Sequence, residues 1–180
     1  MDTLRNRLRA ATALHHERVD AAFSTFQLSQ PSGYRAFLLA HAHVLIPLEE
    51  TLEHAGIALM IDDWAQRRRA QALRADLADL GSAAPPPTPH EVPLSAGWCW
   101  GAAYVIEGSR LGGRVLARRV AEADPSAPLR YLGHSSATPL WPSFLEKLEL
   151  HASRCAWSDV LAGAHDAFER FQAAAKVHRP

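Results

Sequence analysis

The segment from Leu94 to Val120 constrains the fold of this 180-residue chain most strongly, because it holds five of the ten glycines in an otherwise helix-forming stretch. It contains no proline, and Ala, Leu, Val and Arg fill most of its other positions. A glycine inside a helix costs about 1 kcal/mol relative to alanine, so five cost on the order of 4 to 5 kcal/mol. The fold must therefore need a backbone that something approaches closely.

Two arrangements explain these glycines. Gly97 and Gly101 are four residues apart, as are Gly108 and Gly112, so each pair shares a helix face, as packing against a neighbouring helix requires. The adjacent pair Gly112 and Gly113 instead favours a bend that lets a flat ligand lie against the backbone. Spacing alone leaves both arrangements open.

The rest of the pattern predicts an all-α fold, with one domain over residues 1–180. Val, Ile and Thr are sparse, and apolar residues recur every three or four positions. Thr3 and Asp63 are the expected N-caps, and Pro47 is expected to kink the second helix. The expected helices are 4–23, 31–56, 63–80, 94–120, 141–151 and 158–177, with a stiff extended connector at 82–89.

Charge and cysteine content argue against several classes of protein. Nineteen basic residues balance nineteen acidic ones, so no overall field attracts nucleic acid. We interpret the Arg67–Arg69 cluster as solvated helix surface, Glu107 likewise, and expect the two cysteines to be reduced. No stretch reaches the ~18 apolar residues that a membrane span needs. We therefore expect a cytoplasmic protein that binds neither nucleic acid nor membrane.

His15 and His16 are the best candidates for a ligand among the ten histidines. They lie at the edge of the apolar face of the first predicted helix. One of them is either a core-edge histidine bonded to a backbone carbonyl or an axial ligand to a haem iron. Helical periodicity does not choose between the two residues. The spacing of the other histidines argues against a dinuclear site.

Two motifs resemble the haem oxygenase family. The stretch 8–16, Leu-Arg-Ala-Ala-Thr-Ala-Leu-His-His, resembles its proximal-helix motif, which joins Leu, a basic residue, Ala-Thr and a ligating His at these spacings. The stretch 104–113, Tyr-Val-Ile-Glu-Gly-Ser-Arg-Leu-Gly-Gly, is similar to the distal helix of the bacterial biliverdin-producing branch, often found beside bacteriophytochromes. Two further stretches, residues 33–38 and 76–81, are also similar to this bacterial branch, and they extend the resemblance over most of the chain.

The resemblance implies a helical fold with haem between the first, proximal helix and a kinked, glycine-rich distal helix. It places the iron ligand at His16 and a propionate partner at Arg9, with Thr12 also in contact with haem. Arg130 and Lys147 are candidates for the second propionate.

On the distal side, the resemblance assigns haem contacts to Gly108, Gly112 and Gly113, and catalytic roles to Gly108, Ser109 and Gly112. Ser109 stands where the mammalian branch has an Asp that organises a water network. A serine hydroxyl can hold a water, but it cannot act as a carboxylate.

The implied reaction uses O2 and reducing equivalents to convert haem, both substrate and cofactor, to biliverdin, Fe(II) and CO. The electron donor would be a ferredoxin, an NAD(P)H-dependent reductase or ascorbate, and the biliverdin would supply a bacteriophytochrome or be a by-product of iron release. Two alternatives stay open. One is a non-catalytic haem carrier or sensor on the same fold, and the other is an all-α interaction module without haem whose glycines serve packing only.

Overall fold

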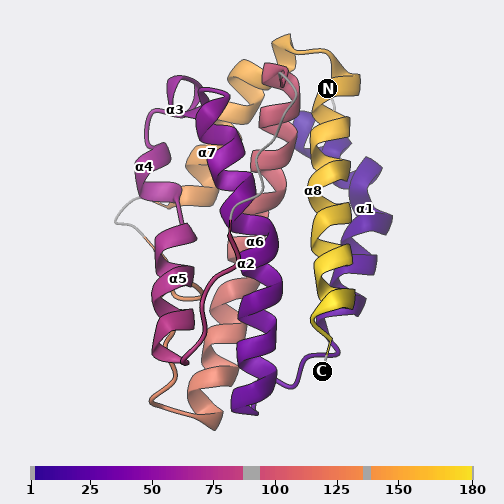
Figure 1. The fold of residues 1–180 in the computed structure, drawn as a ribbon. Helices are drawn as coiled ribbons and strands as arrows, with labels where there is room; N and C mark the ends of the chain where they lie inside the picture. The colour runs from indigo at the N-terminus through magenta and orange to yellow at the C-terminus, as the bar shows by residue number, and fades with distance from the viewer. Residues whose placement is uncertain (1–2, 87–93, 136–138, 180) are drawn as a thin grey trace.

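The computed structural model describes residues 3–86, 94–135 and 139–179. Every regular element in these ranges is helical, which confirms the predicted all-α class (Figure 1). The elements in chain order are α1 (Leu4–Phe23), α2 (Pro31–His54), α3 (Ile57–Met60), α4 (Trp64–Arg67), α5 (Ala70–Asp79), α6 (Ala96–Ala123), α7 (Leu140–His151), the 3-10 turn η1 (Ala152–Arg154) and α8 (Trp157–Val177).

Helix α8 packs against both the N-terminal helix α1 and the glycine-rich helix α6, and so holds the two together. It also packs against α2, while α7 contacts both α1 and α6 (Figure 1). The other side of α2 is covered by α5. Within the described ranges, no helix has the length and apolar character that crossing a membrane requires.

Local signals set most helix ends as predicted. The Thr3 hydroxyl accepts a hydrogen bond from the Asn6 backbone nitrogen at 3.2 Å, as an N-cap does. Gly56, the predicted stop of the second helix, has a φ of +83°, a left-handed conformation that favours glycine. Helix α2 continues through Pro47, and α6 is unbroken across Gly112 and Gly113, where the sequence favoured a bend. In the connector, residues 82–86 are not helical, and 87–89 lie outside the described residues.

The predicted helix over 63–80 was wrong, because the chain forms α4 and α5 with a break between them. The buried Glu49 carboxylate accepts hydrogen bonds from the backbone nitrogens of Arg69 and Ala70 at 2.8 and 2.9 Å. A carboxylate at this position satisfies the first N–H groups of α5, and so starts a new helix there. Asp63 precedes α4, but its carboxylate binds the Arg67 side chain instead of capping the backbone.

The first glycine pair serves helix packing. A Cβ on Gly101 would overlap the Val160 carbonyl oxygen and lie 2.7 Å from the Ala164 backbone nitrogen. From the opposite helix, a Cβ on Gly163 would overlap the carbonyl oxygen of Trp98. The backbones of α6 and α8 are therefore in contact, and any side chain at either position would push the helices apart.

We predict that Gly101→Ala destabilises the protein, because the added methyl group has no space between α6 and α8. The free energy of unfolding should fall by about 1 to 3 kcal/mol, measured by urea denaturation. Gly112→Ala is the matched control, because no atom of another described element lies within 4 Å of its Cβ position, and alanine there gains up to ~1 kcal/mol. Equal stability of the two variants would contradict the backbone contact.

Candidate functional site

The C-terminal half of α6 carries the second glycine pair on a face that is exposed at Gly112. Gly101, Gly108 and Gly112 follow at intervals of seven and four residues, which keeps them on one side of the helix. Helix α8 covers this side at Gly101, and Figure 1 shows the two helices separating beyond that point. Among the described residues, no atom beyond the chain neighbours of Gly112 and the backbone of its own helix lies within 4 Å of its Cβ position.

Apolar side chains surround this uncovered backbone. Leu111 and Val115 are 58% and 54% exposed, although both are large and hydrophobic. At the other end, a Cβ on Gly108 would lie 3.6 Å from the ring of Trp141 in α7, and Trp141 packs against Tyr104 with ring centroids 5.8 Å apart. We call this surface the open face of α6, formed by Tyr104, Gly108, Leu111, Gly112 and Val115.

The basic side of α1 lies near the Tyr104 end of the open face. Burial raises the pKa of the Tyr104 hydroxyl, and the nearby positive charges of Arg5 and Arg9 oppose that rise. Thr12 and His16 continue the Arg9 side of the helix at intervals of three and four residues. Thr12 is buried, and its hydroxyl donates to the Leu8 carbonyl at 2.8 Å. Arg9 of α1 therefore lies near Tyr104 of the open face, and His16 follows two turns further along the same side of the helix.

The two adjacent histidines differ in their surroundings. The His15 ring stacks on His165 of α8, with centroids 4.3 Å apart, and burial with the neighbouring His165 lowers its pKa. The His16 side chain is 64% exposed, and its Nδ1 lies 3.0 Å from the Asp20 carboxylate. Its Nε2 has no partner among the described residues. Metal-binding histidines commonly have one ring nitrogen on a carboxylate and the other on the metal, so this geometry favours His16.

A network of buried charges lies behind the open face. The fully buried Arg67 side chain binds the equally buried Glu107 carboxylate at 2.6 Å and donates to both oxygens of Asp63. Arg110 donates to the other oxygen of Glu107 at 2.8 Å and also to the Arg67 carbonyl. The prediction that Arg67–Arg69 and Glu107 form solvated surface was therefore wrong for Arg67, Arg69 and Glu107. Arg67 and Glu107 are buried together as an ion pair, and the Arg69 guanidinium is buried on the Ile106 carbonyl and the Ser109 hydroxyl.

Ser109 belongs to this network. Its hydroxyl donates to the Ile106 carbonyl at 2.6 Å and accepts from the Arg69 guanidinium at 2.8 Å. Arg69 also donates to the Ile106 carbonyl, lies over the Tyr131 ring at 5.1 Å, and has a buried Nε with no partner among the described residues. An arginine therefore stands beside the predicted catalytic serine, and sequence analysis missed it. The run of three arginines after two aspartates was the available signal.

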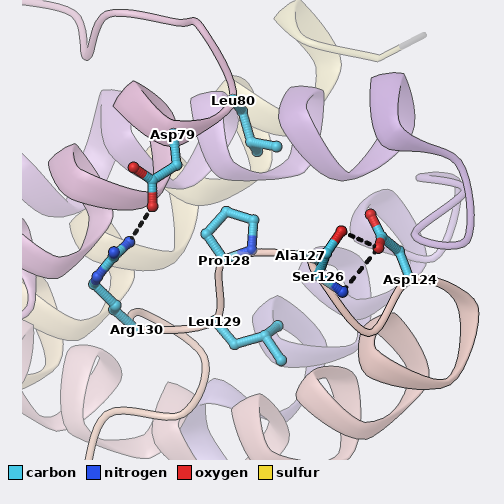
Figure 2. A pocket seen from close by; sticks show the side chains of 8 residues that line it. All are labelled: Asp79, Leu80, Asp124, Ser126, Ala127, Pro128, Leu129 and Arg130. Carbon is cyan, nitrogen blue, oxygen red and sulfur yellow. Dashed lines mark hydrogen bonds and ion pairs between the residues drawn. The ribbon is translucent and has the colours of Figure 1, made fainter.

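Three other residues that were predicted to contact haem, Gly113, Lys147 and Arg130, have their nearest partners outside the open face. A Cβ on Gly113 would sit 3.0 Å from the Leu132 carbonyl oxygen, so this glycine faces a loop and not the open face. Lys147 pairs with Asp62. Arg130 pairs with Asp79 at 2.5 Å, beside a hollow between the end of α5 and the 124–130 loop (Figure 2). Both cations are thus paired with a carboxylate, and their role as the second propionate partner stays a prediction.

Comparisons with known proteins agree on one family. A heme oxygenase from Xanthomonas campestris pv. campestris is 38% identical over 146 residues, covering 77% of this chain and 86% of that protein. Heme oxygenase PigA from Pseudomonas aeruginosa is 30% identical over 177 residues, covering 92% of this chain and 87% of PigA. No family model matches the chain.

A solved structure has the same fold. The NO- and CO-bound heme oxygenase from Neisseria meningitidis superposes with a TM-score of 0.85, covering 98% of this chain and 92% of that chain. Its sequence identity is 23%, so this likeness concerns the fold alone.

We predict that His16→Ala abolishes histidine coordination of added hemin, because His16 is exposed, its Nδ1 is held by Asp20, and its Nε2 has no hydrogen-bond partner among the described residues. The Soret spectrum of the ferric complex should change and recover when imidazole is added. His15→Ala is the matched control, because this neighbouring ring is held by His165. The assignment is off by one residue if His15→Ala alone changes the spectrum.

Proposed function

This chain belongs to the haem oxygenase family, and we propose that it cleaves haem with O2 and external electrons to give biliverdin, Fe(II) and CO. The observation that supports the proposal is the pairing of the exposed His16 ring, through Nδ1, with the Asp20 carboxylate, on the same side of α1 as Arg9. Bound haem supplies both the iron that activates oxygen and the ring that is cleaved. The chain supplies the ligand, the orientation and the protons.

On the proximal side, we assign the iron ligand to His16. The Asp20 carboxylate, 3.0 Å from Nδ1, holds the ring orientation and strengthens Nε2 as a donor. Arg9 is exposed on the same side of α1, and we assign it to a propionate, which carries the opposite charge. Thr12 contributes to the seat through its buried position one turn before His16.

On the distal side, the open face fits a flat apolar ligand. Leu111 and Val115 offer exposed apolar surface, and covering it with a porphyrin ring removes it from water. The missing side chains at Gly108 and Gly112 let the ligand approach the backbone. We propose that these two glycines leave room for oxygen beside the ring.

Proton delivery is assigned to Ser109. Its hydroxyl is fixed by the Ile106 carbonyl and by Arg69, and one lone pair of the oxygen is left to hold a water. The hydroxyl proton is already engaged by the Ile106 carbonyl, so the water would donate to the free lone pair, and Ser109 would hold and orient the water that carries the proton. This arrangement replaces the carboxylate that Ser109 lacks.

The electron donor and the fate of the product complete the proposal. We assign the electrons to a ferredoxin, an NAD(P)H-dependent reductase or ascorbate, and the biliverdin to a bacteriophytochrome that takes it as chromophore. The support for the second assignment is the resemblance of residues 104–113 to the branch found beside such photoreceptors. Co-expression with a bacteriophytochrome apoprotein tests it through the absorbance of the assembled photoreceptor.

The reaction itself is tested by adding hemin and then ascorbate to the purified protein under air. We expect the Soret band to decay while biliverdin appears, identified by chromatography. The control is the His16→Ala variant with the same reductant. A hemin complex that survives reduction without releasing biliverdin would show a carrier, and absence of any hemin complex would show an interaction module.

We predict that Gly112→Leu lowers biliverdin formation by at least ~10²-fold, because the side chain would occupy the space next to the backbone and shift the ligand by about 1 Å or more. Far-ultraviolet circular dichroism should stay unchanged, since no atom of another element in the described part of the chain lies within 4 Å of the Cβ position. Gly112→Ala, with one methyl group, should retain more activity. Full turnover by the leucine variant would remove Gly112 from the substrate site.

A further inference from the structure

Arg67 uses every hydrogen-bond donor of its side chain. Nε donates to Asp63 at 2.8 Å, one terminal nitrogen donates to Glu107 and to the Leu140 carbonyl, and the other donates to Asp63 and to the Ser143 hydroxyl. These five bonds equal the five N–H groups of a guanidinium. The side chain is fully buried, so water does not replace a lost partner.

The partners of Arg67 are close in sequence to Gly108 and Trp141, the two residues that meet at one end of the open face. Glu107 immediately precedes Gly108 in α6. Leu140 and Ser143 lie on either side of Trp141 in α7, and the Trp141 ring is 3.6 Å from the Cβ position of Gly108. One guanidinium therefore fixes the distance between the glycine backbone and the tryptophan ring.

Neighbouring contacts make this arrangement stiff. Arg110 holds the second oxygen of Glu107, so neither carboxylate oxygen is free to turn. The Trp141 ring stacks on Phe144 at 5.8 Å and contacts Tyr104 at the same centroid distance. The ring therefore closes the Gly108 end of the open face, while at the other end no other element in the described ranges comes within 4 Å of the Gly112 Cβ position.

We propose that Arg67 is a positioning residue that sets how far the haem ring enters the open face, by holding Trp141 against Gly108. The inference rests on the proposed function. A planar ligand between α1 and α6 can slide or rotate in its own plane. The fixed ring of Trp141 at one end restricts the haem to one in-plane position and orientation, which we call its seating. The seating decides which ring edge lies over Gly112 and therefore which meso carbon reacts.

The test compares hemin complexes of Arg67→Lys, Ser143→Ala and Trp141→Phe with wild type. Lysine keeps the charge but cannot bind Glu107, Leu140 and Ser143 together. Ser143→Ala removes one link to α7 and keeps the buried ion pairs. Arg68→Gln is the control, because this adjacent arginine is exposed and pairs only with Glu53 in the described structure.

Two readouts report the seating. Proton NMR of the paramagnetic hemin complex gives a haem-methyl pattern that depends on orientation in the plane, and chromatography gives the biliverdin isomers. We expect Arg67→Lys and Trp141→Phe to lose the wild-type methyl pattern and the wild-type isomer ratio. A tenfold change in that ratio needs only ~1.4 kcal/mol between two seatings. Arg68→Gln should match wild type in both.

The outcomes separate this inference from the proposed function. Wild-type methyl patterns and isomer ratios in all three folded variants would overturn the role of Arg67, even with haem cleavage intact. If Arg67→Lys does not fold, Ser143→Ala and Trp141→Phe decide by the same two readouts. If wild type binds hemin without forming biliverdin, the proposed function fails, and the methyl pattern alone decides whether Arg67 sets the seating.

Discussion

The contact between the backbones of α6 and α8 is the constraint on which the rest of the structure depends. Gly101 and Gly163 leave no room for a side chain between these helices. Helices α6 and α8 approach closely at Gly101 and separate further along (Figure 1), so α8 does not cover the α6 glycine face at Gly112. Helix α8 also holds α1 through the His15–His165 stack. The position of α1 relative to the open face thus follows from the same contact.

The buried charges behind the open face supply a different kind of rigidity. Taking a guanidinium and a carboxylate out of water costs several kcal/mol each, and good geometry with full hydrogen bonding is needed to offset it. Arg67 and Glu107 meet this condition, because their side-chain donors and acceptors are all engaged. Such a network has one low-energy arrangement. It therefore holds the back of α6 while the front stays open for a ligand.

The network also shows where reasoning from the sequence failed. Arg67, Arg69 and Glu107 carry charge, and charged residues are normally assigned to the surface, even where a local partner such as Asp63 for Arg67 is visible. Arg67 and Glu107 are 40 residues apart in the chain, and so are Arg69 and Ser109, so no local spacing reveals these two pairs. The break between α4 and α5 was missed for the same reason, because the carboxylate that starts α5 comes from Glu49 in another helix.

The sequence by itself determined the all-α class, most helix ends and the family resemblance, because periodicity, capping residues and short motifs are local properties. It also showed that one helix carries too many glycines for an ordinary surface. Only the tertiary structure decided that Gly101 packs against α8 while Gly112 is open, and that His15 is stacked while His16 is available. The physical reason is that periodicity assigns a residue to a face of a helix, whereas what covers that face depends on segments far away in the chain.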